Sequence, residues 1–238
     1  YAGGNNIGIR QAISAGTDFI WILNPDIQLD KNCLKLLLSF ANSHPDASIL
    51  SPKVYFFPGS EFHQDRYKSV HKGKVIWSAG GNINWQAVIG QNEGLDEVDS
   101  LRFSHSKQID FATGASIFCK SIVFEKLNGF DERYFLYLED ADFSVRARQA
   151  GFSLWFVPNA KVWHKNATSS QVGGDLHDYY LSRNRLLFGF THGSTRLKIA
   201  LARESFKFLI SGRFWQKRGI LDFYLGRFGQ GSFSPRKN

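Results

Sequence analysis

The chain has 238 residues, of which 43% are hydrophobic and 21% charged, a composition typical of a globular protein with a sizeable core. No window approaches the roughly 18 consecutive apolar residues of a membrane span, and the first residues lack a signal-peptide pattern. Cys33 and Cys119 lie in apolar segments, which predicts buried thiols rather than a disulfide framework. Two such thiols favour a reducing compartment.

The net charge of +8 is concentrated near the C-terminal end. Residues 1–174 carry 17 basic and 17 acidic side chains, whereas residues 175–238 carry 12 and 4. This change in composition predicts a boundary near Gly173-Gly174. Because the chain opens on Tyr1 and contains no methionine, we expect an N-terminally truncated fragment.

Apolar periodicity predicts the first elements in chain order. Residues 6–15 show a helical pattern that ends at Gly16, and residues 19–23 form an apolar run typical of a fully buried strand. A helix followed by such a strand favours a parallel sheet. A second helix is predicted between a cap at Asp30 and His44.

The remaining elements follow the same α/β alternation. Strands are predicted over residues 49–57, 75–85, 110–120, 153–157 and 161–164, and helices over residues 121–128, 139–149 and, three times, from residue 175 onward. The polar segments at 58–74 and 90–107 have the irregular character of an insertion that determines specificity.

Asn24-Pro25-Asp26 ends the strand at residues 19–23, because proline cannot continue the hydrogen-bond ladder. Asp26 therefore lies in a short loop at the carboxyl end of a strand, where open α/β sheets bind ligands. A turn role and a ligand- or metal-binding role are about equally favoured for Asp26.

Three acids, Glu139, Asp140 and Asp142, follow a run of aromatic and aliphatic residues, where charge is costly. In a helix over residues 139–149, Asp140 lies on the core-facing side of the first turn. Asp142 is predicted to pair with Arg146 four residues later, and complementing the helix dipole accounts for it. Asp140 is the better candidate for a general base.

His164 ends the run at residues 161–164. A single histidine in such a position is more often structural than a ligand. Two carboxylates and one histidine nevertheless suit Mg²⁺ or Mn²⁺. No Walker loop, dinucleotide fingerprint, zinc-type cysteine spacing or nucleophile elbow is present.

Two segments resemble the family-2 glycosyltransferases, in particular the rhamnosyltransferase-like branch of cell-surface polysaccharide enzymes. They are GGNNIGIRQAISAGTDFIWILNPDIQLD and DFATGASIFCKSIVFEKLNGFDERYFLYLEDADFSVRARQAGFSLWFVPNAKVWH, and the likeness runs from about residue 3 to 190. The resemblance implies a GT-A fold, a Rossmann-like α/β domain with a mostly parallel sheet flanked by helices. We expect this domain, without its first strand, over residues 1–174 and a basic helical region over residues 175–238.

The resemblance also implies roles for individual residues. Asn24-Pro25-Asp26 matches the family's metal motif, with Asn24 where the first acid often stands, so Asp26 is the expected ligand of Mg²⁺ or Mn²⁺. His164 matches a Trp-His histidine that completes the metal site in some relatives. The pair Glu139-Asp140 matches the family's Glu-Asp, with Asp140 as the base.

Two further pairs are assigned to the donor by the same resemblance. Gly114-Ala115 matches a turn near the donor and acceptor pockets. Arg183 and Asn184 match an Arg-Asn pair that is expected near the donor diphosphate.

The implied activity is an inverting transfer of rhamnose or a similar hexose from a dTDP- or UDP-sugar to a growing, lipid-linked cell-surface glycan. Asp140 would take the acceptor proton while the metal neutralises the departing diphosphate. The alternative is a non-catalytic nucleotide-sugar- or glycan-binding module, a degenerate relative or an inactive fragment. The complete Glu139-Asp140 pair favours the enzyme, and the missing front favours the module.

Basic side chains alternate with apolar ones after residue 175. The simplest interpretation is a solvated basic face on core-packed helices. A second is an amphipathic surface on anionic lipid, where lipid-linked acceptors lie. Nucleic-acid binding is not expected, because no recognised module is present. We expect a cytoplasmic protein, peripheral on the inner face of the cytoplasmic membrane.

Overall fold

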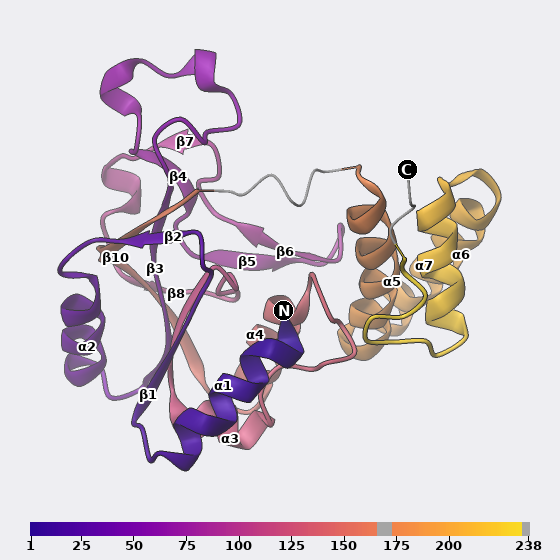
Figure 1. The fold of residues 1–238 in the computed structure, drawn as a ribbon, viewed down its shortest axis with the longest axis horizontal. Coiled ribbons are helices and arrows are strands. Elements are labelled where there is room, and N and C mark those ends of the chain that lie inside the picture. Colours follow the sequence, from indigo (N-terminus) through magenta and orange to yellow (C-terminus); the bar gives the residue numbers. More distant parts are fainter. Residues whose placement is uncertain (166–172, 235–238) are drawn as a thin grey trace.

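The computed structural model describes residues 1–165 and 173–234, which form an α/β part and a group of three C-terminal helices beside it (Figure 1). The helices are α1 Ala2–Ser14, α2 Cys33–Ser43, α3 Ser121–Leu127, α4 Glu139–Gln149, α5 Asp175–His192, α6 Thr195–Ser211 and α7 Phe214–Tyr224. The strands are β1 Phe19–Leu23, β2 Ile27–Leu29, β3 Ala47–Phe56, β4 Val75–Ser78, β5 Gly81–Asn84, β6 Ile89–Asn92, β7 Glu97–Val98, β8 Lys107–Gln108, β9 Ser116–Lys120 and β10 Ser153–His164.

The main sheet has the order β1-β9-β3-β10-β2, with β4, β7 and β8 attached at its side. Its longest ladder, between β3 and β10, is parallel, and the other pairings of the described strands are antiparallel. The α/β architecture is as expected, but the expectation of a mostly parallel sheet is wrong. An apolar run such as residues 19–23 indicates burial and not the direction of its neighbour, and β1 pairs with antiparallel β9.

Several predicted boundaries move for local reasons. The first helix begins at Ala2 rather than at residue 6, so the opening glycines and asparagines are helical. The segment 75–85 divides into β4 and β5 at Gly80, whose φ of +79° is favourable for glycine. The two strands predicted over residues 153–164 are one strand, with a register shift between Val157 and Lys161 that accommodates Pro158.

The other departures are shorter elements. The segment 110–120 forms a strand only from Ser116, and α2 begins at Cys33 after Asn32 rather than at Asp30. The Asp30 carboxylate accepts the backbone N–H of Asn32 instead of capping the helix. Cys33 and Cys119 are buried free thiols, as predicted.

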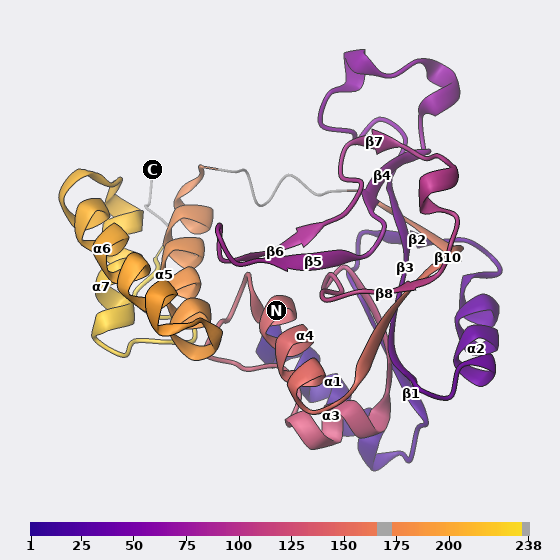
Figure 2. The same cartoon turned by 180° about the vertical axis from the view of Figure 1, so that it is seen from behind.

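The sheet is covered on both faces. α2 packs on one face, and α1, α3 and α4 lie on the other, as both views show (Figures 1 and 2). The three predicted C-terminal helices are confirmed. α5 and α7 approach so closely at Gly219 that a Cβ there would clash with the Tyr179 carbonyl oxygen.

A common apolar core joins the C-terminal helices to the α/β part. It contains Leu138 and Val145 from the α4 region and Leu186 and Phe188 from α5. The hairpin of β5 and β6 also reaches α5, where Trp85 stacks on Phe188 with ring centroids 5.5 Å apart. None of the described helices is long and apolar enough to cross a membrane.

Candidate active site

A cavity of about 450 Å³ lies where β1 and β10 end and α4 begins. Seven of the nine residues expected at the site line it. They are Asn24, Asp26, Gly114, Ala115, Glu139, Asp140 and His164. The structure therefore brings together the strand-end turn, the Gly-Ala turn and the acidic pair, which are far apart in the sequence.

The Asp26 side of the cavity is set by pairing between β2 and β10. Ile27 pairs with His164, and the Lys165 N–H donates to the Asp26 carbonyl at 3.0 Å. The turn that carries Asp26 is tight, since the Ile27 N–H donates to the Asn24 carbonyl at 3.1 Å. This register places the Asp26 carboxylate 3.1 Å from His164 Nε2.

His164 is buried in the cavity wall, with the Trp77 ring edge-on at 4.7 Å between centroids. Burial lowers the pKa of His164, although the charge of Asp26 opposes this shift. The neutral imidazole that results is the form that binds metals. Its Nδ1 is buried without a hydrogen-bond partner among residues 1–165 and 173–234.

The Asp26–His164 pair fits a divalent cation that takes its other ligands from phosphate oxygens and water, as Mg²⁺ commonly does. The described residues contain no cluster of three or more His, Cys, Asp or Glu side chains that could hold a metal ion. Asp26, His164 and a second carboxylate therefore do not form one metal site in this structure. Asp140, the other carboxylate considered, is bound to the N–H groups of Gly114 and Ala141.

Asp140 is a half-buried carboxylate held by main-chain N–H groups. Its two oxygens accept the N–H groups of Gly114 and Ala141, each at 2.8 Å. A Cβ on Gly114 would lie 2.9 Å from the Tyr1 hydroxyl and 3.3 Å from Asp140, so glycine permits this close approach. Burial raises the pKa of Asp140, while the two N–H bonds oppose the rise.

Glu139 is more deeply buried than Asp140, and its Oε2 finds no hydrogen-bond partner in the described part of the chain. Burial and, second, the charge of Asp140 raise the pKa of Glu139 to about 8. At neutral pH Glu139 therefore keeps its proton, whereas Asp140 is stabilised as a carboxylate by its two N–H donors. The arrangement pairs one neutral acid with one charged base.

The loop before α4 has an unusual backbone. Phe135, Tyr137 and Leu138 have positive φ angles of 63°, 68° and 69°, and Leu138 is the N-cap of α4. Side-chain-bearing residues rarely adopt this conformation, which must be imposed by surrounding contacts. The loop delivers Glu139 and Asp140 to the cavity.

Asn184, fully buried in α5, supplies contacts of this kind. Its Nδ2 lies 2.8 Å from each of the carbonyl oxygens of Tyr134, Leu136 and Tyr137, which share its two N–H groups. These contacts run along the loop and hold its carbonyl groups toward α5. The Tyr1 ammonium group contacts the same loop, at the Phe135 carbonyl.

Arg183, also fully buried, completes the anchor. Its guanidinium bonds the Asn184 side chain and four carbonyl oxygens, those of Arg133, Tyr134, Arg227 and Gly229. All five N–H groups are thereby engaged. Neither Arg183 nor Asn184 lines the cavity. The structure gives them another role than the expected contact with a donor diphosphate: both bind carbonyl groups of the loop before α4.

Asp142 also differs from its expectation. The predicted pair with Arg146 is present at 2.6 Å, but Asp142 is fully buried rather than a surface partner of the helix dipole. Its second oxygen lies 2.7 Å from Nε2 of His192 at the end of α5. Asp142 thus provides a second polar link between α4 and the C-terminal helices.

Sequence reasoning missed four residues of the wall, which are Tyr1, Trp77, Thr113 and Leu176. Leu136 and Tyr137 also line the cavity, and they belong to the aromatic run before Glu139, whose position indicates a pocket wall. Trp77 carries no such signal, because it lies in an ordinary apolar strand pattern.

Two adjacent carboxyl groups and an Asp–His pair thus line one cavity of an α/β domain, which makes this cavity the candidate active site. Residues 3–178 match the model of the family described as "Glycosyltransferase like family 2". The match covers most of the chain, and the chain belongs to this family.

Curated relatives agree with this assignment. The chain is 29% identical over 159 residues to an N-acetylglucosaminyl-diphospho-decaprenol L-rhamnosyltransferase of Mycobacterium tuberculosis, covering 64% of this chain and 48% of that protein. It is 25% identical over 189 residues to the low-salt glycan biosynthesis hexosyltransferase Agl10 of Haloferax volcanii (79% and 56%). It is 28% identical over 151 residues to rhamnosyltransferase WbbL of Escherichia coli (63% and 53%). The chain thus spans about half the length of these relatives.

Two solved structures are similar at lower levels. One is GalNAc-T7 with UDP, GalNAc and Mn²⁺, with a TM-score of 0.46 and 14% identity over 84% of this chain and 42% of that chain. The other is mannosyltransferase PcManGT from Pyrobaculum calidifontis with GDP-Man and Mn²⁺, with a TM-score of 0.43 and 12% identity over 94% and 65%.

The protonated state of Glu139 predicts how stability depends on pH. Its folded-state pKa of about 8 exceeds the ordinary value of 4.5, so this contribution to stability is full below pH 4.5 and is lost as the pH rises from there through about 8. Glu139→Gln should remove this fall and stabilise the protein at about pH 9 by on the order of 5 kcal/mol relative to wild type. Urea unfolding of wild type and Glu139→Gln at low and high pH measures this difference in the free energy of unfolding. The same pH dependence in both proteins would contradict a protonated Glu139.

The anchoring of the loop predicts a specific effect of Asn184→Ala. The substitution leaves three carbonyl groups without their donor and should lower the free energy of unfolding by about 3 kcal/mol. Thermal unfolding with Asn42→Ala as control measures this, since Asn42 is exposed on α2 and its change should stay within about 0.5 kcal/mol. An equal loss of unfolding free energy in the two variants would refute the role of Asn184 in holding the loop.

Proposed function

We propose that this chain carries the catalytic site of an inverting glycosyltransferase. The reaction moves rhamnose or a similar hexose from a dTDP- or UDP-sugar to a hydroxyl of a growing, lipid-linked cell-surface glycan. The observation that carries the proposal is the Asp140 carboxylate, which two N–H groups hold in the same cavity as Asp26 and His164.

Asp140 acts as the general base in this reaction. It takes the acceptor hydroxyl proton as that oxygen bonds to the anomeric carbon, while the bond from this carbon to the diphosphate oxygen breaks. Direct displacement inverts the anomeric centre. Neutral Glu139 adds no second negative charge beside the attacking oxygen, and its proton offers a hydrogen bond to a substrate oxygen.

Asp26 and His164 are proposed to hold Mg²⁺ or Mn²⁺, which supplies positive charge for the departing diphosphate. Asn24 and Ala115 complete this end of the cavity, where the Asn24 N–H donates to the Ala115 carbonyl at 3.1 Å. This hydrogen bond fixes the turn that presents Asp26 against the Gly-Ala turn that presents the base. The donor binds where the two turns meet.

The C-terminal helices are proposed to rest on the inner face of the cytoplasmic membrane. Phe206, Ile210, Phe214 and Leu225 on and beside α6 and α7 are each more than half exposed. Exposed basic residues accompany them, which are Arg196, Arg203, Lys207, Arg213 and Arg227. Apolar and basic groups on one pair of helices suit an anionic lipid surface.

Removal of the base tests the central step. Asp140→Asn should lower kcat by about 10²–10⁴-fold, because a neutral amide cannot take the proton. The amide can accept only one of the two N–H groups that Asp140 accepts, so the melting temperature is measured alongside to establish that the variant is folded at the assay temperature. Asp18→Asn, at an exposed position, serves as the control. Transfer to the acceptor is followed together with the anomeric configuration of the product. Near-normal turnover in Asp140→Asn, or a retained configuration, would rule out this role.

Metal dependence is tested by chelation and by titration. EDTA should abolish transfer, and Mn²⁺ or Mg²⁺ should restore it. His164→Ala should weaken Mn²⁺ binding at least about tenfold, whereas the exposed His105→Ala should leave it unchanged. Full activity in EDTA, or equal Mn²⁺ affinity in both variants, would contradict the assignment.

Membrane binding is tested with vesicles that contain phosphatidylserine. The protein should sediment with them at low salt and be released at high salt, because the basic groups contribute through screened attraction. The double substitution of Phe206 and Ile210 by Ser should weaken binding, and Ile7→Ser, an exposed change on α1, should not. Binding that neither salt nor the double substitution affects would refute the proposal.

A further inference from the structure

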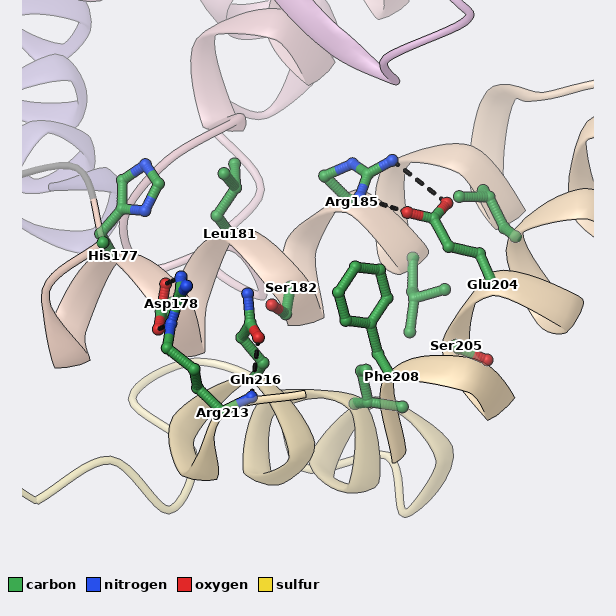
Figure 3. Close-up of a pocket in the computed structure, with 14 residues that line it drawn as sticks. His177, Asp178, Leu181, Ser182, Arg185, Glu204, Ser205, Phe208, Arg213 and Gln216 are labelled. Carbon is green, nitrogen blue, oxygen red and sulfur yellow. Dashed lines mark hydrogen bonds and ion pairs between the residues drawn. The ribbon is translucent and has the colours of Figure 1, made fainter. Parts of the chain in front are cut away.

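A second cavity, here called the helical cavity, lies between α5, α6 and α7 (Figure 3). Its volume is about 290 Å³, near the lower end of the range for small-molecule sites. Its lining is partly apolar and partly polar. The apolar residues are Leu181, Leu186, Leu201, Phe208 and Ile220, and the polar ones include His177, Asp178, Arg185, Glu204, Arg213 and Gln216.

Two ion pairs stand at the polar side of the helical cavity, as the close-up shows (Figure 3). Asp178 of α5 pairs with Arg213 beside α7, and Arg185 of α5 pairs with Glu204 of α6 at 3.1 Å. Arginine side chains bind phosphate oxygens through the same paired N–H geometry that they use for carboxylates. The cavity thus combines apolar side chains with two guanidinium groups, each of which is paired with a carboxylate.

The helical cavity lies next to the catalytic cavity. Leu176 and Tyr137 line the catalytic cavity, and His177 lines the helical one. The rings of Tyr137 and His177 are in edge contact, with centroids 5.6 Å apart. A wall of a few side chains therefore separates the two spaces.

α6 carries apolar side chains toward the helical cavity and away from it. Phe208 lines the cavity, whereas Phe206 and Ile210 are exposed. A helix that only packs on a core has one apolar face. The second face of α6 brings an apolar outer surface close to the apolar interior of the cavity.

We propose that the helical cavity binds the first part of the apolar chain of an acceptor in which a sugar is joined through a diphosphate to an isoprenoid. The order of groups in such a molecule matches the order of sites: the sugar at Asp140, the diphosphate near His177 and Arg213, and the chain among the leucines. This inference rests on the proposed function, and it assigns a site to the acceptor's lipid portion.

Ser182 allows the cavity to be filled without removing an ion pair. It is half-buried on α5 and lines the helical cavity. Ser182→Trp occupies the space of the apolar chain, and Ser182→Ala keeps it open. The probes are geranylgeranyl diphosphate and inorganic pyrophosphate, which share the diphosphate and differ in the chain, and their binding is measured by calorimetry without donor.

Wild type and Ser182→Ala should bind geranylgeranyl diphosphate more tightly than pyrophosphate. Ser182→Trp should lose about tenfold in affinity for the first probe, as expected when a few methylene groups lose their buried site, and keep its affinity for the second. Equal affinity of wild type for both probes, unchanged binding in Ser182→Trp, or an equal loss for both probes would overturn the proposal.

Transfer assays separate this proposal from the proposed function. With acceptors that carry the same sugar diphosphate, Ser182→Trp should raise KM about tenfold for a long isoprenoid chain and leave it unchanged for a short one. An equal rise for both acceptors would overturn the cavity assignment while leaving the glycosyltransferase intact. Absence of transfer by wild type to either acceptor would contradict the proposed function, and the calorimetry would then decide on the cavity alone.

Discussion

The burial of Glu139 beside Asp140 is the constraint on which the rest of the site depends. Two adjacent carboxylates in an apolar wall cannot both be charged without a large free-energy cost. The two carboxyl groups differ in their hydrogen bonds. Asp140 accepts two main-chain N–H groups, whereas Oε2 of Glu139 accepts none in the described part of the chain and Glu139 keeps its proton. Two neighbours in one helical turn therefore have different charges.

Holding this pair in place requires the C-terminal helices. The loop that leads into α4 has three residues with positive φ, and the buried pair Arg183–Asn184 of α5 binds its carbonyl groups. Asp142 and His192 form a second link between α4 and α5. The change in charge near residue 174 therefore marks a change in surface character, while a shared core and a shared polar anchor join the two regions.

The site was predictable where one residue and its local element suffice. Asp26 follows a strand that ends at a proline, Asp140 falls in the first turn of a regular helix, and both line the cavity. The contacts of Arg183 and Asn184 with the loop could not be predicted, because a residue type does not reveal whether its partner is a phosphate or a carbonyl group. Two predictions about strands were wrong for a related reason, namely that β1 has a parallel neighbour and that residues 153–164 form two strands. Strand pairing is a long-range property that an apolar run does not encode.

The site as described requires that Glu139 is protonated and Asp140 ionised at neutral pH. Isotope-edited infrared spectroscopy of carboxyl groups tests it directly, with Glu139→Gln and Asp140→Asn used to assign the bands. We predict that the protein at pH 7 shows a protonated carboxyl band that disappears in Glu139→Gln, and that this band is lost as pH rises through about 8. An ionised Glu139 at pH 7, with no protonated band assigned to it, would contradict these protonation states.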